Sequence, residues 1–105
     1  MAWVTLGAAG LFEIGFVIGL KFTDGFTRLV PSLLTAVAGG VSFYLLSVAL
    51  QTLPVGTAYA VWTAIGASGA VLVGVVLLDE PAGMLRIIAV AVVLGGVVML
   101  RLAEQ

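Results

Sequence analysis

The chain has no cysteine and no histidine among its 105 residues. The first absence excludes disulfides and thiolate metal sites. The second removes the usual proton carrier at neutral pH and the commonest metal ligand. Any proton chemistry must therefore fall to a carboxylate, and we expect neither a metal site nor a cofactor.

Charged residues are also scarce. They make up 9% of the chain, whereas a soluble domain carries about 25%. Hydrophobic residues reach 63%, which is typical of a membrane protein. The chain also lacks a glycine-rich phosphate loop, a nucleophile paired with a base, and a basic patch. We therefore expect neither enzyme activity nor a nucleic-acid partner.

The hydrophobic residues form four segments, at about 2–20, 29–50, 55–78 and 84–102. A helix needs about 20 mostly apolar residues to cross a bilayer, and continuous apolar runs favour helices over the alternating strands of a barrel. We predict an all-α membrane protein, one domain over 1–105, with four transmembrane helices and both termini on one side. Pro81 suits the first turn of the last helix, and Asp79 can cap it.

The basic residues favour one orientation only weakly. Lys21, Arg28 and Arg86 flank the first and third connections, whereas Arg101 and the terminal amine lie opposite. Because basic residues set orientation, so small a bias permits insertion in both directions.

Glu13 lies inside the first segment, with twelve uncharged residues before it and seven after it. A carboxylate at the centre of a membrane helix costs about 2.5–3.5 kcal/mol even on the mildest scale. An acidic residue inside a membrane helix, despite this unfavourable free energy, indicates an ion, proton or cation site. Four short helices enclose little space, so two copies sharing a chamber between their acids are favoured over a lone monomer.

Helical spacing groups other side chains into candidate site faces. These are Gly10, Phe16 and Val17 beside Glu13 in the first segment, and Tyr59, Trp62, Thr63 and Gly66 in the third. Aromatic rings beside a buried acid suit an organic cation, through cation–π attraction and charge pairing. There are plainer alternatives, since Phe16 can face lipid and Tyr59 can belong to the aromatic belt at the membrane surface.

Two further features each leave alternatives. The Ser42 hydroxyl can bond its own helix backbone, Glu13, or a neighbouring aromatic polar group. The fourth segment carries a strip of small residues, Ala89, Ala91, Gly95 and Gly96. Small residues let membrane helices approach closely, so this strip suits either a contact with a second copy or packing within the chain.

The chain resembles the small multidrug resistance family of proton-coupled exporters over essentially its whole length. The resemblance rests on Glu13, on Lys21–Ser32 (KFTDGFTRLVPS) and on Leu53–Trp62 (LPVGTAYAVW). The segments Leu53–Tyr59 and Ile18–Lys21 are most similar to the guanidinium-exporter branch.

This resemblance implies an antiparallel, dual-topology homodimer in the cell membrane, with one site between two copies of Glu13. Glu13 would bind either protons or the cation, and the third helix would bend near Gly66. Ser42, Tyr59 and Trp62 would hold the carboxylates and line the site. The implied function is proton-coupled export of guanidinium or small substituted guanidinium cations by alternating access.

The alternatives differ in substrate, in subunit composition or in class. Phe16 stands where the guanidinium branch usually has Trp, and Gly15 replaces a larger side chain. A site without the indole donor suits bulkier cations, so a broader exporter of quaternary ammonium compounds is one alternative. A subunit of a heterodimeric transporter is another. A passive channel or a structural membrane subunit is a different class.

Overall fold

The computed structural model describes residues 2–104. Met1 and Gln105, the two ends of the predicted 1–105 domain, lie outside these described residues. The chain forms four helices, α1 (Ala2–Phe22), α2 (Leu29–Ala49), α3 (Val55–Leu77) and α4 (Met84–Ala103), and residues 2–104 contain no strand. Each helix begins at the residue where a hydrophobic segment was predicted to begin. All four are long and apolar enough to cross a membrane, which confirms the predicted class of an all-α, four-span membrane protein.

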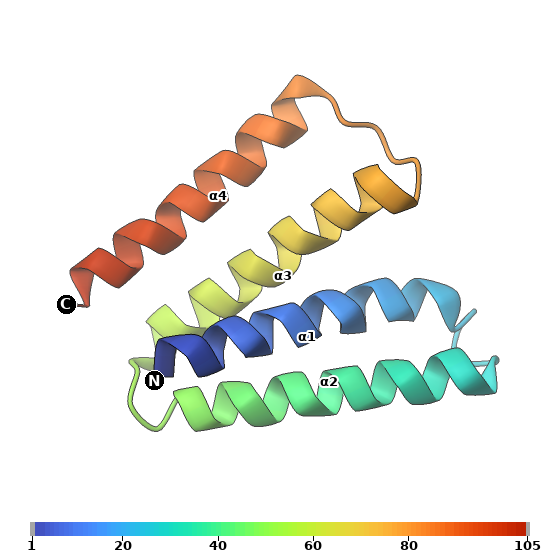
Figure 1. Cartoon of the computed structure of the whole chain (residues 1–105), viewed down its shortest axis with the longest axis horizontal. Helices are drawn as coiled ribbons and strands as arrows, with labels where there is room; N and C mark the ends of the chain where they lie inside the picture. Colours follow the sequence, from blue (N-terminus) through green and yellow to red (C-terminus); the bar gives the residue numbers. More distant parts are fainter. Residues whose placement is uncertain (1, 105) are drawn as a thin grey trace.

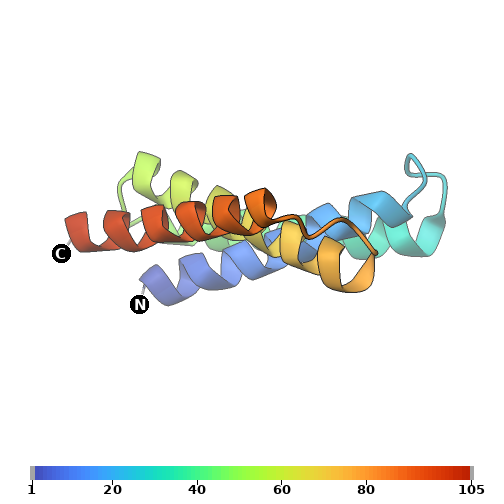
Figure 2. The same cartoon turned by 90° about the horizontal axis from the view of Figure 1, so that it is seen from above.

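The helices form a thin assembly, 43 × 34 × 17 Å along its principal axes, as Figure 2 shows from above. Helix α1 packs against both α2 and α3, whereas α4 packs against α3 (Figure 1). The two termini lie at the same end, as four spans require, and the α1–α2 and α3–α4 connections lie at the other. Helices α1 and α3 therefore lie in the middle of the assembly, between α2 and α4 (Figure 1).

The buried core is small and consists of compact side chains around one aromatic ring. Its members are Leu6, Ala9, Ala49, Ala58, Val61 and Trp62. Most large apolar side chains of α2 and α4 point outward, which is the expected arrangement when lipid is the solvent. Packing between small residues lets the helices approach closely without a large hydrophobic centre.

The start of α4 differs from the sequence prediction. Asp79 adopts a positive φ of 57°, and the next backbone N–H, that of Glu80, donates to the carbonyl of Gly74 at 3.1 Å. The chain thus folds back on the end of α3 before it leads to α4, which begins at Met84 with Gly83 at its N-cap. The placement of Pro81 in the first turn of α4, and of Asp79 as its cap, was wrong.

Candidate cation-binding site

A groove of about 420 Å³ lies between α1 and α3, and Glu13 lines it from α1. The predicted residues that line it from α3 are Tyr59, Trp62, Thr63 and Gly66. The structure thus brings the acid of the first helix and the predicted face of the third helix to one place. We call this space the Glu13 groove.

Gly66 makes room for the acid. A Cβ atom added at Gly66 would lie 2.8 Å from Glu13 Cγ, closer than two carbon atoms can approach without a shift. The Glu13 side chain therefore rests directly on the backbone of α3. The absence of a side chain at Gly66 sets how close the carboxylate lies to that helix.

The Glu13 carboxylate is incompletely satisfied. Its Oε1 atom is buried, and no donor within residues 2–104 forms a hydrogen bond to it. A buried polar atom without a partner costs about 1–3 kcal/mol, and more when it is charged. A proton or a cation with N–H donors would remove this cost, so the geometry is suited to binding either one.

Ser42 links three helices rather than touching Glu13. Trp62 Nε1 donates to Ser42 Oγ at 2.9 Å, and Ser42 Oγ donates to the carbonyl of Ala9 at 2.7 Å. Of the alternatives for Ser42, the structure shows the bond to an aromatic polar group. The hydroxyl does not line the Glu13 groove, but it positions the Trp62 ring that does.

Four aromatic rings form a row from α1 across α2 to α3. The ring centroids are 6.1 Å apart for Phe16 and Phe43, 5.6 Å for Phe43 and Trp62, and 5.7 Å for Trp62 and Tyr59. Phe16 lies against α2, where a Cβ added at Gly39 would come within 2.6 Å of its ring. Phe16 therefore does not line the Glu13 groove, although helical spacing predicted it beside the carboxylate.

Gly10 is likewise placed by packing. It is buried in α1, and a Cβ there would lie 2.5 Å from Ile65 Cγ2 of α3. Its part in the site is indirect, since it lets α1 and α3 approach next to Glu13.

Val17, Ala67 and Ala70 complete the Glu13 groove with small or apolar surface. Helical spacing placed Val17 on the face of Glu13, but Ala67 and Ala70 were not predicted. Helical spacing could have found them too, since each follows a predicted α3 residue by four.

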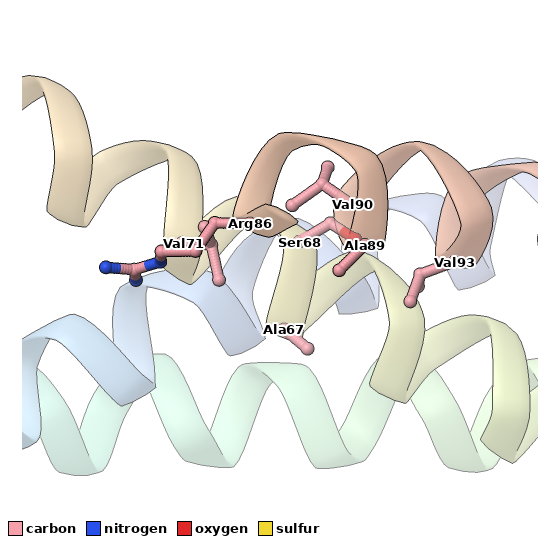
Figure 3. A pocket seen from close by; sticks show the side chains of 7 residues that line it. All are labelled: Ala67, Ser68, Val71, Arg86, Ala89, Val90 and Val93. Carbon is pink, nitrogen blue, oxygen red and sulfur yellow. The ribbon is translucent and has the colours of Figure 1, made fainter. Parts of the chain in front are cut away.

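The small residues of the α4 strip lie in different environments. Ala89 lines a pocket of about 160 Å³ between α3 and α4 (Figure 3), and Gly96 lines a second one of about 510 Å³. Gly95 is exposed, and a Cβ there would meet nothing within 4 Å. These spaces are lined mainly by apolar groups and contain no acid, so neither offers a cation the charge partner that Glu13 does.

The fold and this groove define a class: a small multi-pass membrane protein with a carboxylate and aromatic rings set within its membrane-spanning helices. Comparison with known proteins identifies the family. The sequence profile of the family described as Small Multidrug Resistance protein matches residues 1–93. The chain belongs to this family, which confirms the resemblance found in the sequence.

Several curated relatives share half of their residues with this chain. The protein named Guanidinium exporter of Yersinia pseudotuberculosis serotype I (strain IP32953) is 50% identical over 104 residues, which cover 99% of this chain and 100% of the relative. Proteins with the same name from Citrobacter freundii and Salmonella typhimurium (strain LT2) are 50% and 48% identical over 105 residues, 100% of both chains. These relatives are transporters by name.

Proposed function

We propose that this protein exports guanidinium or a small substituted guanidinium in exchange for protons, and that Glu13 binds both. The observation that carries the proposal is Glu13 Oε1, a buried carboxylate oxygen without a donor among the described residues, in a groove flanked by Tyr59 and Trp62. The names of the relatives support the choice of cation. Guanidinium is planar, carries N–H donors that match a carboxylate, and stacks on aromatic faces.

Exchange follows from competition for the same oxygen atoms. A charged carboxylate within a membrane is unfavourable unless it is paired or neutralised. A proton neutralises Glu13, and an arriving cation replaces that proton. If the groove opens to the other membrane face only slowly when Glu13 is charged and binds neither a proton nor a cation, inward proton flow drives outward cation flow. Alternating access then consists of helices rocking around a fixed site, with α3 bending near Gly66.

The groove of one chain is open on one side, which favours a homodimer. Tyr59 lines the groove yet is 58% exposed. A second copy, inserted in the opposite orientation, would cover this ring and bring a second Glu13 to the same chamber. The exposed Gly95 of α4, with Ala89 and Gly96 nearby, provides a close-contact surface for the partner. We place this antiparallel dimer in the cell membrane.

Electrical recording on protein reconstituted into liposomes tests the proposal. Guanidinium applied to the wild type should evoke a current that depends on the pH gradient, and Glu13→Gln should abolish it. Asp24→Asn is the matched control, because Asp24 lies in the exposed α1–α2 connection. Full coupled transport by Glu13→Gln would refute the role of Glu13.

The same preparation separates the substrate classes. Guanidinium, phenylguanidinium and tetrapropylammonium should be compared at equal concentration, with guanidinium and its derivative giving the larger currents. Current from tetrapropylammonium alone would instead identify an exporter of quaternary ammonium compounds. Because only this chain is reconstituted, coupled exchange would also show that no related subunit is required.

A further inference from the structure

A second groove continues the first one toward the end of the molecule where α1 meets the α3–α4 connection. It has a volume of about 250 Å³, and Lys21, Glu80 and Arg86 are among its lining residues. Val17 and Ala70 line both this groove and the Glu13 groove. The two spaces therefore adjoin, and together they extend along the contact between α1 and α3.

Glu80 is held at this end by the fold of the connection. Its backbone N–H donates to the Gly74 carbonyl at 3.1 Å, and its carboxylate lies so close to Gly74 that a Cβ atom there would overlap it. Gly66 plays the same part for Glu13. Each of the two acids thus lies on a glycine of α3, and eight residues of helix separate these glycines by about 12 Å.

The partner of Glu80 is itself a guanidinium group. Arg86 Nη2 lies 3.3 Å from Glu80 Oε1. The side chains of Arg86 and Glu80 are 35% and 37% exposed, and ion pairs with that much exposure contribute little to stability. Figure 3 shows the Arg86 side chain extending from α4 past Val71, with its guanidinium end apart from the other labelled side chains.

Arg86 can release Glu80 without losing its place. Its Nη1 atom donates a separate and shorter hydrogen bond, of 2.8 Å, to the carbonyl of Pro81. A free guanidinium ion carries the same kind of N–H donors as the head group of Arg86, so it can take over the carboxylate while Arg86 keeps its bond to Pro81.

From these contacts we propose that Glu80 is a second cation site, which guanidinium occupies by displacing Arg86 on its way to or from Glu13. This inference rests on the proposed function. Lys21 lines the same groove, and its positive charge weakens binding by repulsion, so the cation leaves the site readily. In an antiparallel dimer, one copy of Glu80 lies at each membrane face, which provides one such site at each opening.

Two substitutions with opposite expected effects test the site. Glu80→Gln removes the charge and should raise the apparent KM for guanidinium transport about fivefold, the scale of one half-exposed charge contact. Arg86→Gln removes the competing guanidinium, so Glu80 is free and the apparent KM should fall. Glu80→Asp keeps the carboxylate and should stay nearer to the wild type than Glu80→Gln does. Equilibrium binding to Glu13, followed by the change in intrinsic tryptophan fluorescence, to which Trp62 contributes, should change less than twofold in Glu80→Gln.

The opposite directions of the two expected KM changes distinguish a cation site from an ion pair that only stabilises the fold. Both Glu80→Gln and Arg86→Gln break the same ion pair, so a purely structural role would change KM in the same direction in both. That result, or an unchanged KM in Glu80→Gln, would overturn the proposal while leaving the role of Glu13 intact. If the wild type gave no Glu13-dependent guanidinium current, the proposed function and this site would both be refuted.

Discussion

The indole nitrogen of Trp62 is hydrogen-bonded to Ser42 Oγ at 2.9 Å. The indole has one polar hydrogen and no acceptor, so this bond leaves only the face and edges of the ring for anything in the Glu13 groove. Trp62 can therefore offer a cation in the groove only its π-face and no hydrogen bond. Ser42, on α2, sets the orientation of a ring that belongs to α3.

Removing this acceptor should destabilise the protein and loosen the ring. Ser42→Ala leaves a buried indole N–H without a partner, which costs about 1–3 kcal/mol. We expect a lower melting temperature in detergent and a change in Trp62 fluorescence. Ser47→Ala is the control, because the hydroxyl of the exposed Ser47 donates to the carbonyl of Tyr44 in its own helix. Equal losses of stability in both variants would contradict the role assigned to Ser42.

Gly66 offers a test of how closely Glu13 must lie against α3. Gly66→Ala places a Cβ 2.8 Å from Glu13 Cγ, so the carboxylate has to move. We expect guanidinium affinity to fall about tenfold, equivalent to about 1.4 kcal/mol, while the helix content stays the same. Gly56→Ala makes the same change in the first turn of α3, where a Cβ meets nothing within 4 Å, and should bind like the wild type. Wild-type affinity in Gly66→Ala would show that the contact does not matter.

A substitution at Phe16 tests whether this residue only packs against α2 or also acts on the bound cation. Its ring lies against Gly39 and Phe43 rather than in the Glu13 groove. Phe16→Leu should therefore lower stability by about 1 kcal/mol, through lost aromatic and packing contacts with α2. Guanidinium affinity should stay within about twofold of the wild type, since a change below about 0.4 kcal/mol is expected for a residue outside the site. A large loss of affinity at unchanged stability would mean that Phe16 acts on the cation after all.

Hydropathy was enough to predict the four helices and where they begin, and helical spacing to group Tyr59 with Trp62 on one face of α3. The meeting of Glu13 with these two rings was implied by the family resemblance. Neither hydropathy nor spacing could predict which neighbour Phe16 would face. Spacing shows which residues share a side of one helix, but the partner helix depends on where gaps such as the one at Gly39 occur. The position of Glu80 was also beyond the sequence, because it depends on a chain reversal at Asp79, whose positive φ of 57° leaves no hydropathy signal.

The α4 strip provides a test of the proposed dimer that does not depend on transport. A Cβ added at Gly95 meets nothing within 4 Å in the single chain, so a side chain there starts in open space and extends toward any molecule packed on this face. Gly95→Leu should lower the fraction of dimer, measured by energy transfer between labelled copies in liposomes. Gly40→Leu on α2, where a Cβ also meets nothing, should leave the dimer fraction nearly unchanged. Equal dimer fractions in both variants would place the interface elsewhere.

Competition between protons and cations should be visible in binding alone. If both occupy the Glu13 carboxylate, lowering the pH must weaken guanidinium binding, because each bound proton has to leave before the cation binds. Where Glu13 is mostly protonated, the apparent Kd should rise about tenfold for each unit that the pH falls, the slope for one exchanged proton. Isothermal titration of the purified protein at several pH values, in buffers of different ionisation enthalpy, measures both the slope and the proton released. Glu80→Gln should keep the slope, since the site near Arg86 is separate from Glu13, whereas a pH-independent Kd in the wild type would exclude exchange at one carboxylate.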